Sequence, residues 1–478
     1  MKLTDPDLFR QAALIAGEWI VRPGLEVTNP ATGRAMGSIP DITADETEAA
    51  IATAEEAMKA WRARTHIERA DILMRWYALM LEHAEDLAQI LTAEQGKPLS
   101  EARGEVHYGA SFLRWFAEEA RRIEGTIIPS PVPGKKILAM KEPVGVCAIV
   151  TPWNFPIAMI TRKVAPGLAA GCAMVVKPSD FTPYSALALA VLAERAGLPP
   201  GVLNILTGRP EAIGATLTAS PVVRKLSFTG STRVGAMLAE QCAPTLKKLS
   251  LELGGNAPFI VFDDADLAAA VEGAMVSKFR NGGQTCVCAN RIMVQSGIHD
   301  VFVAALAARV DALKVGPGTE EDTAIGPMIN AAAIDKIGAH VADALARGAT
   351  RATRARNLNA QYADPVVLVG ATTEMRLADE ETFGPVAPIF RFESEEEALA
   401  IANGTPYGLA AYFYTRDMGR AFRVGEALEF GIVGLNTGLV SHAEAPFGGV
   451  KASGLGREGA REGIEEYLET KAFHFGGL

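Results

Sequence analysis

The feature that most constrains the fold is an alternation that begins at Gly145. Short apolar runs there are separated by Gly- or Pro-marked turns and by longer Ala- and Leu-rich stretches, such as 183–196. Four runs have the length and composition of buried strands: 145–150, 173–176, 202–207 and 223–228. Strands that alternate with helices indicate a parallel sheet with helices on both faces. The sequence therefore predicts a doubly wound α/β domain.

A second α/β unit is predicted further along the chain. Strand-like runs at 257–262, 291–295 and 431–436 alternate with helical stretches that include 265–279 and 299–313. Ahead of both units, Thr43 and Glu46 fit a capping box that opens a helix, and further amphipathic helices are expected over 69–91 and 99–123. An alternating segment beside a Pro-rich stretch, within 124–143, predicts a hairpin.

The amino-acid composition limits which binding partners and which cellular compartment can be expected. The chain has 478 residues, with 46 Lys and Arg against 56 Asp and Glu, which gives a net charge of −10. An acidic balance without a basic block argues against nucleic acid or an anionic membrane as partner. The five cysteines are too few for a secreted disulfide scaffold, and no apolar run reaches the ~20 residues of a membrane span. The N-terminus lacks a signal-peptide layout, so a cytoplasmic protein is expected.

The most informative segment for chemistry is FRNGGQTCVCANR, residues 279–291. Cys286 follows a Gly-Gly-Gln-Thr turn, where the backbone can approach a ligand closely, although an isolated cysteine is more often a buried structural residue. Cys288 raises the further possibilities of a metal pair or a redox pair. The chain has no second cysteine pair or histidine cluster, so no metal site is predicted, and a redox role for Cys288 stays open.

Two other segments supply polar groups beside predicted strands. Glu252 precedes a Gly-Gly turn in LELGG, where apolar neighbours indicate burial and a raised pKa. Asn154, in TPWNFP, follows the strand 145–150 at its carboxyl end, where ligands bind in open α/β sheets. A thiol, a carboxylate and an amide donor are the groups that acyl-transfer chemistry requires.

Six motifs together resemble the NAD(P)-dependent aldehyde dehydrogenase superfamily: GQTC, LELGG, PWNFP, FTGST (228–232), EETFGPV (380–386) and PFGGVKASGLGRE (446–458). The resemblance spans nearly the whole chain. It implies an aldehyde dehydrogenase-like α/β fold with a dinucleotide-binding domain (1–123 and 144–255), a catalytic domain (256–447) and a β oligomerisation arm (124–143 and 448–478). It also implies a homo-oligomer, with a tetramer favoured over a dimer.

The resemblance assigns roles to individual residues. Cys286 matches the nucleophile that attacks the aldehyde, and some local activation of its thiol is expected. Asn154 matches the oxyanion-hole amide, and Glu252 matches the base that activates water to hydrolyse the thioester. Glu469, in YLETK, is matched with a carboxylate that relays protons, although it could equally be a surface residue.

The resemblance further implies a nicotinamide dinucleotide as cofactor. At the position of Asp180, relatives that prefer NAD usually carry Glu, and relatives that prefer NADP carry a small neutral residue. Asp keeps the charge on a shorter side chain, so NAD is expected as the better cofactor, with NADP use left open. The expected cofactor-binding residues are Thr151, Pro152, Trp153, Lys177, Ser179, Asp180, Gly230, Ser231, Gly235, Leu253, Glu381 and Phe383.

Three positions suggest the substrate. Arg162, Arg280 and Ser441 match positions at which succinate-semialdehyde dehydrogenases hold the far carboxylate of the substrate. The other interpretation is that both arginines are solvated or paired with protein carboxylates. Succinate semialdehyde is therefore the predicted small-molecule substrate, with glutarate semialdehyde as its near neighbour and uncharged aldehydes as an alternative.

The same residues bear on other possible activities. CoA-acylating relatives lack the carboxylate at the position of Glu252, so its presence favours hydrolysis. Ester cleavage by Cys286 without a cofactor is a conceivable side reaction. A non-catalytic structural relative would be expected to have lost Cys286 or Asn154, and both are present.

Overall fold

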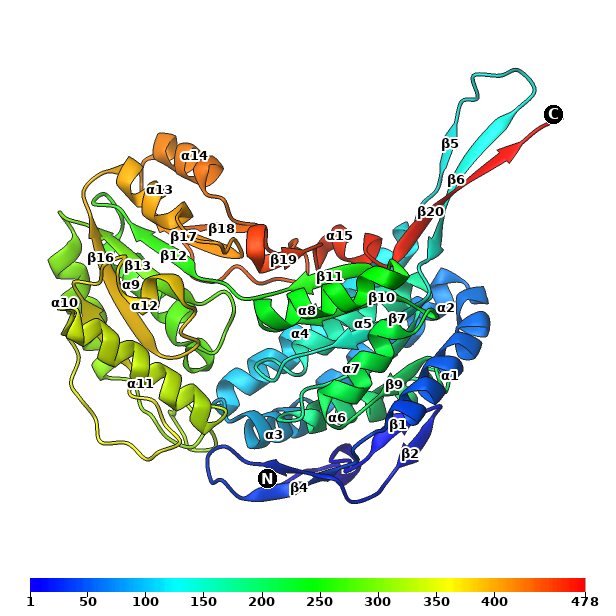
Figure 1. Cartoon of the computed structure of the whole chain (residues 1–478), viewed down its shortest axis with the longest axis horizontal. Helices are drawn as coiled ribbons and strands as arrows, with labels where there is room; N and C mark the ends of the chain where they lie inside the picture. The colour runs from blue at the N-terminus through cyan, green and yellow to red at the C-terminus, as the bar shows by residue number, and fades with distance from the viewer. Residues whose placement is uncertain (478) are drawn as a thin grey trace.

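The computed structural model describes residues 1–477, which form two α/β units and a projecting three-stranded sheet (Figure 1). The first sheet has eight strands in the order β19-β11-β10-β7-β8-β9-β1-β2. Its strands are β1 (Ala13–Ile15), β2 (Glu18–Ile20), β7 (Val146–Val150), β8 (Ala173–Lys177), β9 (Leu203–Ile205), β10 (Val223–Thr229), β11 (Lys248–Glu252) and β19 (Gly454–Leu455). The five central strands, β7 to β11, are parallel. Their carboxyl ends therefore meet at one edge, where ligands bind in such sheets.

Helices cover both faces of this sheet, and strand β7 shows why. Cys147 and Ile149 belong to one apolar core, whereas Val146 and Ala148 belong to another, because successive side chains of a strand point to opposite faces. The helices of this unit are α1 (Ala44–Ala63), α2 (His66–Glu82), α3 (Ala84–Gln95), α4 (Leu99–Glu119), α5 (Ala158–Ala170), α6 (Pro183–Arg195), α7 (Pro210–Ala219) and α8 (Thr232–Cys242). The predicted doubly wound unit is present.

Local predictions for the N-terminal part are confirmed in part. The capping box of Thr43 and Glu46 is formed at the start of α1. The helix expected over 69–91 is two helices, α2 and α3, which meet at His83. The first forty residues also hold β1, β2, β3 (Leu25–Thr28) and β4 (Ala35–Ile39), which the sequence did not predict. These strands are only three to five residues long, too short for a clear apolar periodicity.

The second sheet has seven strands in the order β14-β15-β16-β13-β12-β17-β18, all parallel except the β14–β15 pair. Its strands are β12 (Ala257–Val261), β13 (Ala289–Gln295), β14 (Thr350–Arg351), β15 (Val366–Val369), β16 (Val386–Phe392), β17 (Ala410–Tyr414) and β18 (Ile432–Leu435). The helices are α9 (Leu267–Phe279), α10 (His299–Asp311), α11 (Ala331–Ala346), α12 (Arg376–Asp379), α13 (Glu395–Asn403) and α14 (Met418–Ala427). One apolar core of this unit has members from Ala257 to Phe447.

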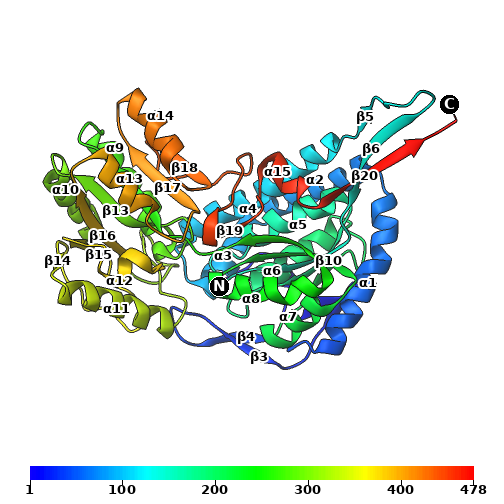
Figure 2. The same ribbon diagram turned by 45° about the horizontal axis from the view of Figure 1, so that its top comes forward.

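The arm is a sheet of β5 (Thr126–Ile128), β6 (Lys136–Pro143) and β20 (Leu468–Phe475) that projects from the first unit (Figures 1 and 2). Ile127, Val132 and Phe473 are exposed on it. The predicted arm boundary at 448 is wrong, because β19 pairs with β11 in the first sheet and α15 (Ala460–Glu465) packs against α4 and α5. Of the C-terminal segment, β20 is the part that belongs to the arm. The homo-oligomer expected from this arm stays a prediction.

Residues 1–477 lack two kinds of feature. Within residues 1–477, the helices are all either too short or too polar to traverse a bilayer. The same residues contain no group of three or more His, Cys, Asp or Glu side chains arranged to hold a metal ion.

Candidate active site

The loop that carries Cys286 takes an unusual backbone path. Asn281, Gly282 and Gly283 have φ values of 52°, 62° and 77°, three successive residues in the left-handed region. A Cβ atom at Gly283 would lie 2.3 Å from the carbonyl oxygen of Gly384. Only glycine fits there, because it needs no Cβ and adopts positive φ without strain. The Gly-Gly motif therefore lets the Cys286 loop approach the loop around residue 384 closely.

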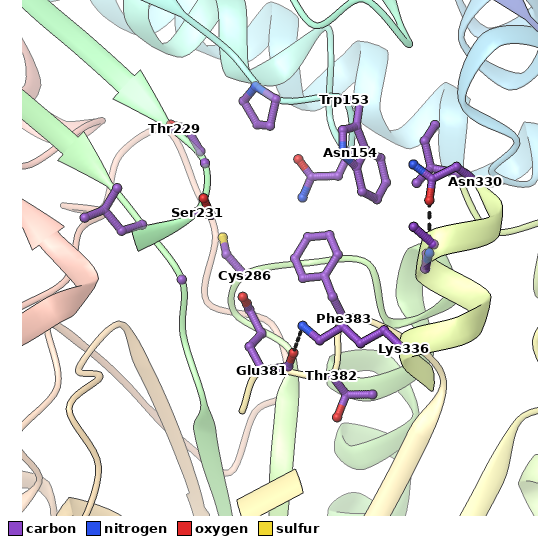
Figure 3. Close-up of a pocket in the computed structure, with 17 residues that line it drawn as sticks. Trp153, Asn154, Thr229, Ser231, Cys286, Asn330, Lys336, Glu381, Thr382 and Phe383 are labelled. Atoms are coloured by element: carbon purple, nitrogen blue, oxygen red, sulfur yellow. Dashed lines mark hydrogen bonds between the residues drawn. The ribbon is translucent and has the colours of Figure 1, made fainter. Parts of the chain in front are cut away.

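Cys286 opens into a pocket of about 360 Å³. Figure 3 shows its thiol between the side chains of Asn154 and Glu381, with the rings of Trp153 and Phe383 to one side. The two rings meet edge to face, with their centroids 5.6 Å apart. The rest of the lining comes from the segments after β10 and β11 and from the start of α11. Segments from both sheets thus meet around one sulfur atom.

The thiol is free and only partly exposed. Burial raises the pKa of Cys286 to about 12, and the charges of Glu381 and Glu252 act in the same direction. Arg162 and Arg280 oppose this rise in pKa. Two cations therefore favour the thiolate, but burial outweighs them, and the pKa of the thiol stays raised.

Asn154 lies on the segment after β7, with its side chain buried. Its Nδ2 donates to the carbonyl oxygen of Gln284, two residues before Cys286, at 3.1 Å. Its Oδ1 has no partner among the described residues. The amide is thus held beside the loop of the nucleophile, as an oxyanion-hole donor must be.

Glu252 ends β11 and directly precedes two pocket-lining residues, Leu253 and Gly254. It is buried, and neither carboxylate oxygen has a hydrogen-bond partner in residues 1–477. Burial raises the pKa of Glu252 well above its usual range, and the nearby charge of Glu458 raises it further. Arg162 moderates the rise. A carboxyl group with a raised pKa is a stronger base once it is ionised, which suits a general base.

The predicted cofactor residues from Thr151 to Leu253 lie at or beside the carboxyl edge of the first sheet, whereas Glu381 and Phe383 precede β16 of the second sheet. Ser231 caps α8, its Oγ accepting from the Val234 amide, and the start of the helix is an anion-binding position. A Cβ at Gly235 would lie 2.4 Å from a Leu253 methyl, so α8 packs directly on the Leu253 turn. Pro152 and Gly230 line the same pocket as Cys286.

Two polar features, one from each unit, fit a dinucleotide. The buried hydroxyls of Thr151 and Thr229 have no hydrogen-bond partner within the described chain. Glu381 accepts from the amide of Gly255 at 3.3 Å, and burial raises its pKa to about 7. Phe383 is held at a φ of 57° beside it. Unpaired hydroxyl groups can bond a ribose, and the Phe383 ring can pack against a nicotinamide ring.

At the end of β8, Lys177 and Asp180 form an ion pair with each other. Lys177 is buried, and burial lowers its pKa, whereas burial raises the pKa of Asp180. Ser179 Oγ accepts from the Phe181 amide at 3.3 Å. The Asp180 carboxylate is therefore drawn toward a lysine of its own loop.

The two arginines differ in their surroundings. Arg162 is buried, forms an ion pair with Glu458 and lies over the ring of Phe447, 4.3 Å from its centroid. Arg280 is half-buried near the ring of Phe155, at 5.4 Å, and has no hydrogen bond or ion pair to any described residue. The interpretation of a protein-paired arginine therefore applies to Arg162, and Arg280 is the uncommitted cation.

Tyr108, Ser441 and Cys288 differ in their surroundings. The Tyr108 hydroxyl is buried without a partner in residues 1–477, and the charges of Arg162 and Arg280 both act on its pKa, which burial raises. Ser441 is half-buried in the loop before Phe447. Cys288 is fully buried, with its Sγ 3.4 Å from Lys278 Nζ, and is not bonded to Cys286.

Glu469 is the one predicted catalytic residue that the structure does not bring to this site. It lies exposed on β20, in the projecting arm, opposite Glu142 of β6. Glu458 occupies the buried position beside Glu252 instead, where it is paired with Arg162 and Lys163. The sequence did contain a signal for it, since Glu458 ends the PFGGVKASGLGRE motif. Lys336 and Asn330 of the pocket wall were also missed, and no motif marks them.

Comparison with known proteins agrees with this geometry. Residues 19–473 match the aldehyde dehydrogenase family. The chain is 57% identical to succinate-semialdehyde dehydrogenase [NADP(+)] of Escherichia coli, over 98% of this chain and 99% of that protein. It is 56% identical to glutarate-semialdehyde dehydrogenase of Pseudomonas putida, again over 98% and 99%.

A solved structure confirms the predicted fold. The crystal structure of succinate-semialdehyde dehydrogenase from Burkholderia pseudomallei superposes with a TM-score of 0.98, at 56% identity, and each chain covers 100% of the other. The motifs, the site and these matches lead to one conclusion. This chain belongs to the aldehyde dehydrogenase family.

Proposed function

We propose that this enzyme oxidises short semialdehydes that carry a distal carboxylate, succinate semialdehyde foremost and glutarate semialdehyde next. This choice rests on Arg280, which stands six residues before the nucleophile. Its side chain has no protein partner in residues 1–477. A planar guanidinium binds a carboxylate through two hydrogen bonds. The names of the E. coli and P. putida relatives, which act on these two semialdehydes, support the same choice.

The far end of the substrate would lie among Arg280, the Tyr108 hydroxyl and Ser441. Tyr108 supports this because its buried hydroxyl is left without a protein partner and both arginine charges reach it. Arg162 is the second cation of the group, although its pairing with Glu458 leaves it less free to bind a ligand. An uncharged aldehyde would leave Arg280 half-buried and unpaired, which is unfavourable.

The proposed reaction starts at the sulfur of Cys286. The thiol gives up its proton to solvent as its sulfur attacks the aldehyde carbon, and the charges of Arg162 and Arg280 favour the thiolate form. The oxygen of the resulting thiohemiacetal accepts from Asn154 Nδ2 and the backbone amide of Cys286, which lowers the barrier by about 3–4 kcal/mol per donor. Bound NAD(P) supplies the hydride acceptor. Glu252 then takes a proton from water, which attacks the Cys286 thioester and releases the acid.

Aldehyde dehydrogenases use NAD(P), and the residues of the sheet edge fit such a cofactor. Lys177, Ser179 and Asp180 would hold the adenine ribose, while Glu381 and Phe383 would hold the nicotinamide end. We propose NAD as the better cofactor because Asp180 carries a negative charge. Its pairing with Lys177 weakens that charge, which supports some use of NADP as well. The E. coli relative is named for NADP(+).

The carboxylate preference rests on Arg280 and is tested by Arg280→Ala. A charge-assisted hydrogen bond contributes roughly 1.5–3 kcal/mol, so the loss of even one should lower kcat/KM for succinate semialdehyde about 10- to 150-fold. The value for butanal should change less than about threefold, since butanal has no carboxylate for the guanidinium to bind. Initial rates of NAD(P)H formation measure both. Arg280→Lys, which keeps the charge but not the planar fork, should fall between the two. Equal losses for both aldehydes would contradict the proposal.

The cofactor preference is tested by Asp180→Ser. Removing the carboxylate removes a partner of the ribose hydroxyls and a repulsion toward a 2′-phosphate. We expect kcat/KM for NAD to fall about tenfold, a loss of ~1.4 kcal/mol, while the value for NADP rises. Titration of each cofactor at saturating aldehyde measures the ratio. A parallel change for both cofactors would show that Asp180 does not discriminate between them.

A further inference from the structure

Lys97 is a buried lysine whose position the proposed reaction leaves unexplained. It lies in the connection between α3 and α4, and its side chain is fully buried. Its Nζ donates to Glu105 Oε2 at 2.6 Å and to the backbone carbonyl oxygen of Asn154 at 2.8 Å. It also lies 3.8 Å from the centroid of the Phe155 ring. A buried ammonium is tolerated only when its donors are used, and here two of its three contacts are with the segment that carries Asn154.

Glu105 continues this arrangement from α4. Its second oxygen, Oε1, accepts from the amides of Ile157 at 2.9 Å and Ala158 at 3.3 Å. These amides open α5, which has no capping side chain of its own. The first amides of a helix need such acceptors. The Lys97–Glu105 pair therefore holds the segment 151–157 at Asn154 and again at its end.

The nucleophile loop is tied to the same point. The carbonyl oxygen of Asn154 also accepts from Asn281 Nδ2 at 3.0 Å. The amide of Asn281 donates to Glu101 Oε2 of α4 at 2.7 Å. Asn281 is the residue that opens the left-handed turn before Cys286. One short stretch, residues 97–105, thus contacts both loops that meet at the reacting carbon.

We propose that Lys97, acting with Glu105, is a positioning residue that sets the Asn154 carboxamide in register with the Cys286 thiol. The inference rests on the proposed role of Asn154 as the oxyanion donor. An oxyanion donor is effective only at hydrogen-bond distance from the developing charge, so a small shift of the Asn154 backbone costs rate rather than binding. Lys97 itself touches neither substrate nor cofactor.

The test is a double-mutant cycle on the pre-steady-state burst of NAD(P)H in the full-length enzyme. Asn154→Ala should slow the burst about 10²- to 10³-fold, the usual cost of one oxyanion donor. Lys97→Met should slow it at least about tenfold, with the Kd of the cofactor changed less than about twofold. The double variant should be within about threefold of Asn154→Ala, because Lys97 acts through Asn154.

A matched control separates positioning from general destabilisation. Lys225, on β10, is also buried, bonds Ser250, lies 3.4 Å from a Glu466 oxygen and faces the ring of Tyr467. It lies near the amino end of its strand, away from the sheet edge that carries the site. Lys225→Met should lower the thermal unfolding temperature and leave the burst within about twofold of the wild-type rate.

Three results would overturn the proposal. In the first, Lys97→Met slows the burst less than about threefold. In the second, the double variant is slowed by the product of the two single effects, and in the third, Lys225→Met slows the burst as much as Lys97→Met does. A normal burst in Asn154→Ala would remove the role of Asn154 and this inference with it, whereas a multiplicative double variant would remove this inference alone.

Should Lys97→Met not fold, Glu105→Gln enters the same cycle. Its amide oxygen still caps α5, and a slowing of at least about threefold that vanishes in Asn154→Ala is expected.

Discussion

Cys286→Ala is expected to abolish aldehyde oxidation, with the steady-state rate lowered at least about 10⁴-fold. Loss of a covalent nucleophile has effects of this size because no other group can form the acyl intermediate. Cys286 is the cysteine that lines the pocket, and its sulfur lies beside Asn154. Rates of NAD(P)H formation with succinate semialdehyde measure the loss, and cofactor binding should persist because the nucleophile does not hold the dinucleotide.

The matched control is Cys242→Ala, the same change at a buried cysteine at the far end of α8. It should keep the rate within about threefold while lowering stability by about 1–2 kcal/mol, the cost of a small cavity. Activity in Cys286→Ala above about a tenth of the wild-type rate would show that the nucleophile is another group.

Glu252→Gln is expected to separate the two halves of the reaction. The first turnover should still release NAD(P)H as a burst, whereas the steady-state rate should fall about 10²- to 10³-fold, the contribution of a general base. Burial and the Glu458 charge raise the pKa of Glu252, and its ionised form is the active base. In the wild-type enzyme kcat should therefore rise with pH as this carboxyl ionises, and in Glu252→Gln this rise should be absent.

Glu94→Gln is the control for this change. Glu94 is fully buried, and burial raises its pKa to about 8, but its carboxylate accepts from the amides of Tyr184 and Ser185 and does not line the Cys286 pocket. Burst and steady-state rates should both stay within about twofold of wild type. An unchanged steady-state rate in Glu252→Gln would mean that another group activates the water.

Much of the fold could be read from periodicity. β7, β8, β10 and β12 lie where apolar runs predicted them, because strands buried on both faces leave an unbroken apolar signal. The strands of 13–39 left no such signal, since each is very short. The arm boundary was misjudged because β19 is two residues long and is defined by its pairing with β11, not by its own composition.

Part of the site could likewise be predicted from the sequence, and part could not. Cys286, Asn154 and Glu252 stand in motifs whose glycines and prolines mark sharp turns at the ends of strands, and the structure brings all three to one sheet edge or its immediate surroundings. Glu469 and Glu458 are both glutamates near the C-terminus, and only the path of the chain distinguishes them. β20 carries Glu469 out into the arm, while an antiparallel bridge between residues 447 and 458 holds Glu458 against the interior.

The sequence by itself determined the fold class, the family and the residue types that do the chemistry, because strand periodicity and turn-forming motifs are local properties of the chain. The tertiary structure alone decided which charges are paired: Arg162 with Glu458, Lys97 with Glu105, and Arg280 with no partner in residues 1–477. Pairing and pKa depend on burial and on distances between residues far apart in the chain, and these exist only once the two sheets have packed together.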